Sequence, residues 1–250
     1  MGTLIVMAGL LFITLFFDLR FRLAYYLAPG NRFQNLSRLQ FDGLRSMLAV
    51  AKTYAGFRII RDSRVRQRLP DRFLIIANHQ SLVDIPVLSL VFPRHNVRFV
   101  AKKELKWGIP SFSFALRKGR HALISRDGDY REAHRELVKL ARLSRRERVC
   151  PVVFPEGTRT RTGKVKRFHS AAVRTLLKHA PLPAVTVAIN GGYRISRLKD
   201  LVRNLRGCAY RVRLLTLYPP PRGREDVKAM IERAHDEIKG QVEEWTRKGN

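Results

Sequence analysis

Phe73-Leu74-Ile75-Ile76-Ala77-Asn78-His79-Gln80-Ser81-Leu82-Val83-Asp84 is a short apolar run that passes abruptly into polar residues. The apolar part, 73–77, has the length and composition of a strand buried on both faces. His79 follows the run almost at once, and Asp84 comes five positions later. In α/β folds, chemically active side chains commonly lie in the turn directly after a strand. The segment therefore predicts a buried strand that ends in a functional turn.

The same alternation of strand-like and helix-like segments continues along the chain. Further strands are expected at 97–101, 149–154, 184–189 and 210–218, with helices at 85–92 and 130–143. Three prolines at 219–221 end the last strand, and apolar residues at helical spacing between 227 and 245 predict a closing amphipathic helix. This order of elements indicates an α/β domain.

The composition indicates a globular protein with anionic partners. Of 250 residues 45% are hydrophobic, and 49 Lys and Arg against 20 Asp and Glu give a formal net charge of +29. Such a surface attracts nucleic acid, anionic lipid headgroups or an acidic carrier protein. The two cysteines, Cys150 and Cys208, form no C-x-x-C pair, so neither a zinc site nor a redox motif is expected.

The first 57 residues differ from the rest and are expected to be membrane-associated helices. Residues 3–17 are apolar except for two threonines, but as a helix they would measure only roughly 22 Å, short of the roughly 30 Å hydrocarbon core of a bilayer. Residues 33–57 carry an apolar stripe at helical spacing. We therefore expect a monotopic or single N-terminal anchor on the cytoplasmic face of a membrane, followed by the α/β domain at 58–250.

A His–Asp pair is a common way to build a general base, because the carboxylate fixes the imidazole tautomer and stabilises the imidazolium. On one regular helix, residues five apart would not share a face. His79 and Asp84 therefore meet only if His79 lies in the turn and Asp84 in the first turn of the next helix. On spacing alone, a helix-capping histidine and an unrelated surface aspartate remain an alternative.

A second polar turn, Phe154-Pro155-Glu156-Gly157-Thr158-Arg159, also follows an apolar run. Glycine lets a ligand approach the backbone closely, and the arginine fork matches phosphate oxygens. This turn therefore predicts an anion-binding site, although an ordinary turn with a salt bridge would have the same composition.

Together these segments resemble the phospholipid/glycerol acyltransferase family, and within it the 1-acylglycerol-3-phosphate acyltransferases. The family motif N-H-x-x-x-x-D is matched by Asn78, His79 and Asp84, and F-P-E-G-T-R is matched at every position from 154 to 159. Between them, Lys103-Glu104-Leu105 and the segment from Gly119 to Arg126 resemble two further family segments. The resemblance implies a mixed sheet flanked by helices, and it covers roughly residues 58–218.

Two segments depart from the family pattern. Thr186 stands where the fourth motif commonly has proline, and 168–171 reads Phe-His-Ser-Ala where F-K-x-G is frequent.

The resemblance also implies roles for individual residues. His79 would act as the general base on the acceptor hydroxyl, and Asp84 would hold and polarise it. The implied substrate-binding residues are Glu156, Gly157, Thr158, Arg159, Arg126 and Lys103. The implied reaction moves a fatty acyl group from acyl-CoA or acyl carrier protein to lysophosphatidate at a membrane of anionic lipids, with no metal or redox cofactor.

The sequence is also compatible with other functions. The acceptor could be another lysolipid, and the fold could serve a non-catalytic membrane-surface protein. A basic nucleic-acid-binding module is consistent with the charge, but the sequence contains no RNP-like, zinc-finger or KH-type signature, so no nucleic acid is expected as a partner.

Overall fold

The computed structural model describes residues 2–125, 129–196, 200 and 203–249, with side chains from residue 7 onward. Its centre is a seven-stranded sheet with the order β1-β7-β6-β2-β5-β3-β4. The strands are β1 (Arg58–Ser63), β2 (Leu74–Ala77), β3 (Asn96–Lys102), β4 (Ala122–Ile124), β5 (Val149–Val153), β6 (Ala184–Asn190) and β7 (Ala209–Tyr218). The five expected strands are confirmed to within one or two residues. β1 and β4 were not predicted, because β1 is largely exposed and so lacks an apolar run, and β4 has only three residues.

The sheet is mixed, as the resemblance implied. Neighbouring strands pair in parallel except β6 and β7, which are antiparallel. The carboxyl ends of β2, β5 and β3 therefore meet at one edge of the sheet, and their amino ends meet at the opposite edge. The polar turns after β2 and β5 lie at the first of these edges.

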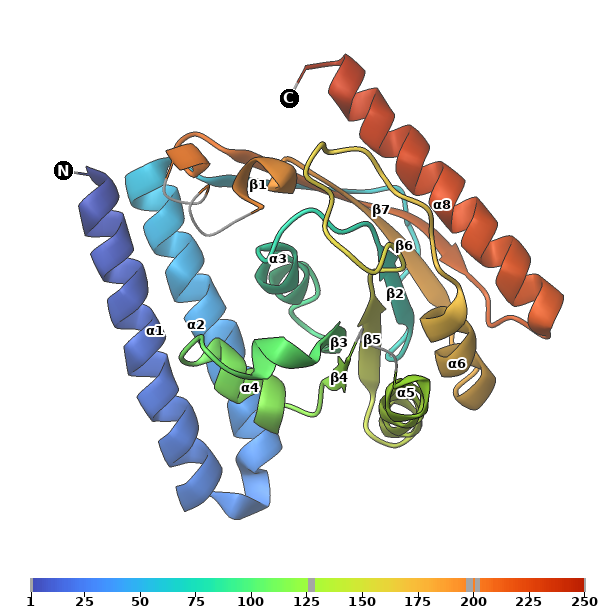
Figure 1. The fold of residues 1–250 in the computed structure, drawn as a ribbon, viewed down its shortest axis with the longest axis horizontal. Helices are drawn as coiled ribbons and strands as arrows, with labels where there is room; N and C mark the ends of the chain where they lie inside the picture. The colour runs from blue at the N-terminus through green and yellow to red at the C-terminus, as the bar shows by residue number, and fades with distance from the viewer. Residues whose placement is uncertain (1, 126–128, 197–199, 201–202, 250) are drawn as a thin grey trace.

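Helices cover both faces of the sheet (Figure 1). On β2, Ile75 and Ala77 belong to the apolar cluster that includes α3, whereas Leu74 and Ile76 belong to the cluster that includes α5, α6 and α8. This alternation follows from the two-residue period of a strand. The helices are α1 (Gly2–Leu27), α2 (Arg32–Ala55), α3 (Asp84–Val91), α4 (Phe112–Lys118), α5 (Tyr130–Arg146), α6 (Ala171–His179) and α8 (Arg224–Arg247).

The first two helices lie side by side as a hairpin (Figure 1). They approach closely because Gly43 has no side chain: a Cβ there would lie 3.1 Å from the Phe17 ring. Phe17 and residues of α2 and α4 form a separate small apolar cluster. Ala51 and Ala55, near the end of α2, already belong to the main core. The proposed division of the chain at residue 57 stays a prediction.

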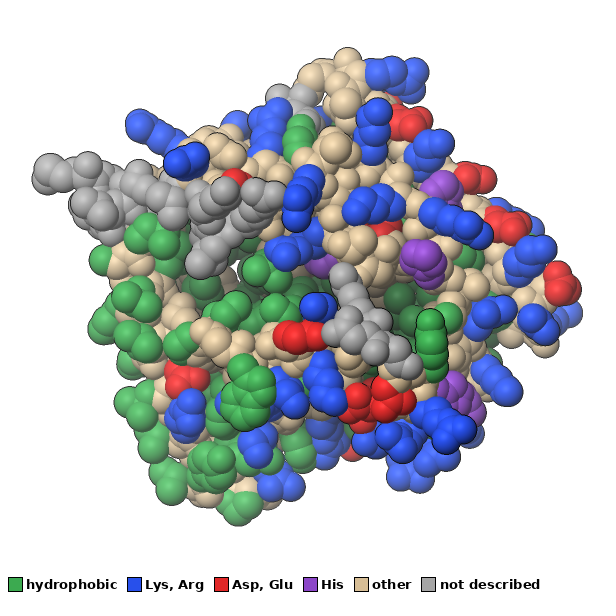
Figure 2. Space-filling view, viewed as in Figure 1, with side chains coloured by type: hydrophobic (Ala, Val, Ile, Leu, Met, Phe, Trp, Pro, Cys, Tyr) green, Lys and Arg blue, Asp and Glu red, His purple; other side chains and the backbone are tan. Residues whose placement is uncertain are grey.

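One side of α1 is apolar and uncovered. Figure 2 shows apolar side chains gathered over the part of the molecule where α1 lies. The exposed residues recur at helical spacing and are Leu11, Phe12, Leu15, Phe16, Leu19, Leu23, Tyr26 and Leu27. Among the described residues, no helix combines the length and apolar character needed to cross a bilayer.

Candidate active site

His79 and Asp84 form a hydrogen-bonded pair at the carboxyl end of β2. His79 lies in the turn after the strand and Asp84 is the first residue of α3, which is the arrangement that the five-residue spacing required. The His79 Nδ1 and Asp84 Oδ2 atoms are 2.6 Å apart. The Asp84 side chain is fully buried, whereas 13% of the His79 side chain remains exposed. The imidazole is therefore the accessible member of the pair.

The Asp84 carboxylate is held from several directions. Its Oδ2 atom also accepts hydrogen bonds from the backbone N–H groups of Gln80, at 2.6 Å, and Ser81, at 3.0 Å. Its Oδ1 atom accepts a hydrogen bond from the Tyr210 hydroxyl. A carboxylate fixed in this way favours the tautomer in which Nδ1–H donates to Asp84, which leaves Nε2 as the basic atom of His79.

Tyr210 is a part of the site that sequence reasoning missed. It lies on β7, 126 residues after Asp84, and is fully buried. Burial and the neighbouring Asp84 raise the pKa of Tyr210 well above its usual value, so the phenol stays protonated and donates. Gly192 permits this contact, because a Cβ there would lie 2.9 Å from the Tyr210 ring and 3.1 Å from Asp84 Oδ1. No local motif marks either residue.

Glu156 joins the two polar turns through their backbones. Its Oε1 atom accepts the N–H of His79 at 2.8 Å, and its Oε2 atom accepts the N–H of Lys166 at 3.0 Å. The Thr160 N–H donates in turn to the His79 carbonyl at 2.8 Å. Burial raises the pKa of Glu156 to about 7, against the lowering effect of the two backbone donors. In this geometry Glu156 positions His79.

The Phe154 ring supports the imidazole from the side. It stacks on His79 with the ring centres 4.2 Å apart, and Phe99 stacks on Phe154 in turn. The imidazole is therefore held by its ring face and its Nδ1 atom, and the backbone of His79 is held as well. Such preorganisation is what a general base needs, because reorganisation during the reaction then costs little.

The other residues of the second turn lie next to the pair. Gly157 has a positive φ of 66°, and both Gly157 and Thr158 are exposed. Arg159 Nη1 donates to the Ser196 carbonyl at 2.6 Å, and Lys166 Nζ donates to the Arg159 carbonyl at 3.1 Å. The structure thus brings the predicted arginine turn to the same sheet edge as His79, while contact of these residues with substrate stays a prediction.

Two further residues, Lys103 and Arg126, were predicted to bind substrate, and the structure describes only the first. Lys103 follows β3 at the same sheet edge, where its Nζ atom lies 2.5 Å from Glu132 Oε1. A role for Lys103 in binding substrate stays a prediction. Arg126 lies outside the described residues.

An apolar cavity of about 210 Å³ lies between the helical hairpin and the turn at 78–83 that carries His79. Leu82 and Val83, within this turn, line one side, and Phe17 and Met47 of the hairpin line another. Ser196, whose carbonyl binds Arg159, is also part of its wall. The cavity thus places apolar surface directly beside the polar residues of the site.

The two departures from the family pattern lie in different parts of the structure. The Thr186 hydroxyl bonds Glu237 of α8 and accepts the Thr216 N–H at 3.1 Å. His169, which stands where F-K-x-G has lysine, lies instead beside the second polar turn. Its N–H donates to the Pro155 carbonyl at 2.8 Å, and a Cβ on Gly157 would lie 3.8 Å from its ring. Thr186 therefore serves a contact with α8, whereas His169 lies next to the candidate site.

Comparison with known proteins identifies the family. The model of the Acyltransferase family matches residues 60–190, which is more than half of the chain and includes both polar turns. The chain belongs to the acyltransferase family. The acyltransferase family match therefore spans His79, Asp84 and the whole turn from Phe154 to Arg159.

Individual relatives bear a more specific name. This acyltransferase is 31% identical over 130 residues to a 1-acyl-sn-glycerol-3-phosphate acyltransferase of Cocos nucifera, covering 52% of the chain and 41% of that protein. It is 37% identical over 91 residues to a protein of the same name from Helicobacter pylori, covering 36% of the chain and 37% of that protein. The matched region is thus about two fifths of the length of these relatives.

A solved structure shares the fold. The 1-acyl-sn-glycerophosphate acyltransferase PlsC from Thermotoga maritima superposes with a TM-score of 0.57 at 23% identity, covering 91% of this chain and 95% of that one. This similarity confirms the predicted α/β fold with a mixed sheet flanked by helices.

Proposed function

We propose that this acyltransferase moves a fatty acyl group from an acyl thioester to the free hydroxyl of lysophosphatidate, giving phosphatidate for phospholipid synthesis. The observation that carries the proposal is the His79–Asp84 pair, 2.6 Å apart and joined through Glu156 to the arginine turn. The names of the Cocos nucifera and Helicobacter pylori relatives support lysophosphatidate as the acceptor.

In the proposed mechanism, His79 Nε2 takes the proton of the acceptor hydroxyl as its oxygen attacks the thioester carbonyl carbon. Asp84 stabilises the imidazolium that forms. The tetrahedral intermediate collapses by breaking the C–S bond, and the departing thiolate receives the proton from His79. General-base help of this kind contributes roughly 10² to 10⁴ in rate. No step requires a metal or redox cofactor.

The substrate has a charged end and an apolar end, and the site offers surfaces for both. We assign the acceptor phosphate to Arg159, Gly157 and Thr158, with Arg126 and Lys103 as further cationic contacts. The apolar cavity beside Leu82 and Val83 would hold hydrocarbon. The acyl donor would be acyl-CoA or acyl carrier protein, both of which suit a basic surface.

The exposed apolar side of α1 suits attachment to a bilayer. Leu15, Leu19 and Leu23 lie on that side with 48–57% of their surface exposed, and Arg20 and Arg22 lie within the same helix. Burial of such a face at the level of the headgroups is favourable, and a net charge of +29 adds attraction to anionic lipid. We propose interfacial attachment on the cytoplasmic face.

Product analysis by mass spectrometry tests the proposal. Purified protein would be given lysophosphatidate or lysophosphatidylglycerol, each with acyl-CoA and with acyl carrier protein as donor. We expect phosphatidate from lysophosphatidate with at least one donor, and a loss of roughly 10² to 10⁴ in rate for Asp84→Asn, because the carboxylate no longer orients His79. Folded protein that gives no product from lysophosphatidate, or Asp84→Asn with full activity, would contradict it.

A further inference from the structure

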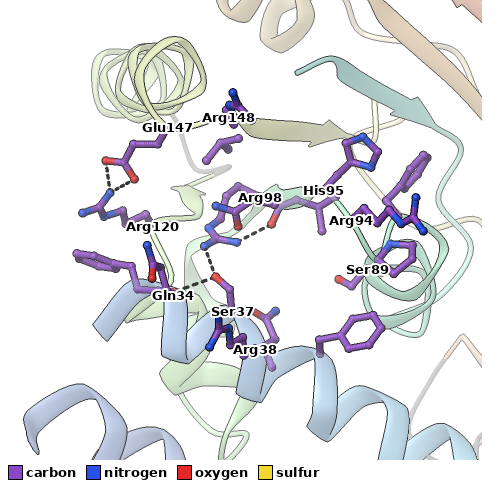
Figure 3. Close-up of a pocket in the computed structure, with 18 of the residues that line it drawn as sticks. Gln34, Ser37, Arg38, Ser89, Arg94, His95, Arg98, Arg120, Glu147 and Arg148 are labelled. Atoms are coloured by element: carbon purple, nitrogen blue, oxygen red, sulfur yellow. Dashed lines mark hydrogen bonds and ion pairs between the residues drawn. The ribbon is translucent and has the colours of Figure 1, made fainter. Parts of the chain in front are cut away.

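A second cavity lies at the edge of the sheet opposite the catalytic turns (Figure 3). Its volume is about 940 Å³, and it is lined by the first turns of α2, the segment after α3, the amino ends of β3 and β5, and the end of α5. β3 and β5 run parallel to β2, so the cavity and His79 lie at opposite ends of these strands. A seven-residue strand separates its ends by roughly 20 Å. The cavity is therefore separate from the active site.

The lining of this cavity is strongly cationic. Two carboxylates, Asp42 and Glu147, face six arginines, which leaves a net charge of +4. His95 adds no charge near neutral pH, because burial lowers its pKa. The arginines are Arg38, Arg94, Arg98, Arg120, Arg146 and Arg148.

Arg98 is the central and most unusual member of this group. Only 5% of its surface is exposed. Its Nη1 atom donates to the Val97 carbonyl at 2.9 Å and its Nη2 atom to the Ser37 hydroxyl at 2.8 Å, as Figure 3 shows. Its Nε atom has no hydrogen-bond partner within the described part of the chain.

Arg98 also lacks a carboxylate partner. Among the described residues, no acidic group lies within ion-pairing distance of it, and the neighbouring Arg120 is already bonded to Glu147. Burial lowers the pKa of Arg98 to about 10, so the group still carries its charge at neutral pH. An unpaired buried charge destabilises the protein. An anion in the cavity would relieve that cost.

The exposed arginines at the rim complete the arrangement. Arg38, Arg94 and Arg146 form no ion pair with any described residue. Several guanidinium forks around one hollow suit a phosphate better than a carboxylate, because a phosphate offers more acceptor oxygens and more charge. The volume is within the usual range for small-ligand sites.

We propose that this cavity binds the phosphate group of an anionic ligand, independently of the catalytic turns. A phospholipid headgroup and a soluble phosphate compound present the same chemistry to the arginines. The first turns of α2 belong to the hairpin whose other helix exposes apolar residues, so either a membrane or the solvent could deliver the ligand.

Binding measurements on the purified protein test the proposal and separate the two sources. Pyrophosphate titrated calorimetrically in chloride buffer probes the soluble source, and cosedimentation with phosphatidylglycerol-containing or pure phosphatidylcholine vesicles probes the headgroup source. The test variant is Arg38→Gln/Arg94→Gln, at two exposed positions of the rim. The control is Arg233→Gln/Arg247→Gln, which removes the same charge from exposed positions on α8.

We expect at least a tenfold loss of affinity for one or both probes in the rim variant, with the control within twofold of the original protein. Loss confined to pyrophosphate assigns a soluble ligand, and loss confined to the anionic vesicles assigns a lipid headgroup. Arg98→Gln should weaken binding of the same probe further. If the Arg98→Gln variant does not fold, the rim variant alone tests the proposal. Absence of binding to both probes, or equal losses in rim and control variants, would overturn the proposal.

Discussion

Buried charged groups lie at both ends of the parallel strands, but they have partners at one end and lack them at the other. At the carboxyl end, Asp84 accepts from three groups besides His79, and both oxygens of Glu156 are bonded to backbone N–H groups. At the amino end, Arg98 is almost as deeply buried, yet it has only neutral acceptors and one unpartnered nitrogen. The buried acids at the carboxyl end find all their partners within the protein, whereas the buried arginine at the amino end gains a counter-charge only from a ligand.

The difference shows how burial serves two purposes. A buried acid whose hydrogen bonds are all satisfied is held rigidly, which suits a group that must orient a catalytic base. A buried cation without a counter-charge lowers the stability of the empty protein and is stabilised when an anion binds. Burial at the catalytic end thus favours rigidity, and burial at the arginine end favours binding.

The largest expected effect concerns His79, the proposed general base at the carboxyl end of β2. His79→Ala should lower acyl transfer by roughly 10² to 10⁴, because no other group takes the proton of the acceptor hydroxyl. The measurement is the initial rate of phosphatidate formation. Vesicle binding should be unchanged, because the exposed face of α1 and the arginine cavity are intact. Full residual activity in purified His79→Ala protein would contradict the assignment of His79 as the general base.

A smaller effect concerns stability and the pKa of Glu156. Its pKa is about 7 in the folded protein against an ordinary value of 4.5, so the folded state binds the proton more tightly. The resulting stabilisation is fully present below about pH 4.5 and is lost as the pH rises to about 7. It amounts to at most on the order of 3 kcal/mol.

Glu156→Gln removes this titration. The free energy of unfolding of the variant should therefore decline less between pH 4.5 and 7.5 than that of the original protein, as measured by urea denaturation. A pH dependence that is parallel in the two proteins would show that Glu156 does not titrate in this range.

The smallest expected effect concerns Tyr210, whose hydroxyl donates to Asp84 and does not contact His79 directly. Tyr210→Phe keeps the buried ring and removes only the hydrogen bond to Asp84, which at about 1.4 kcal/mol corresponds to a roughly tenfold lower kcat. KM should be little changed. Tyr218→Phe, which removes a hydroxyl bonded to Glu237 on the α8 side, is the matched control. Equal losses in both variants would indicate a general packing effect.

Much of this arrangement could be predicted locally. The apolar run at 73–77 predicted β2, and the five-residue spacing required His79 in a turn and Asp84 at the start of a helix, as the structure has it. The second polar turn was also expected at the end of a strand. The contacts of Tyr210 and Gly192 could not be predicted, because more than 100 residues separate them from Asp84 and no local pattern marks them.

By itself, the sequence determined five of the strands in their order along the chain and the two polar turns, because the strand period and turn residues are local properties. Only the tertiary structure decided which charged side chains are buried and which partners they have there. Glu156 is bonded to the backbone of His79, and Arg98 is buried without a carboxylate. The physical reason is that the energy of a charge depends on its burial and on its neighbours in space, which sequence distance does not specify.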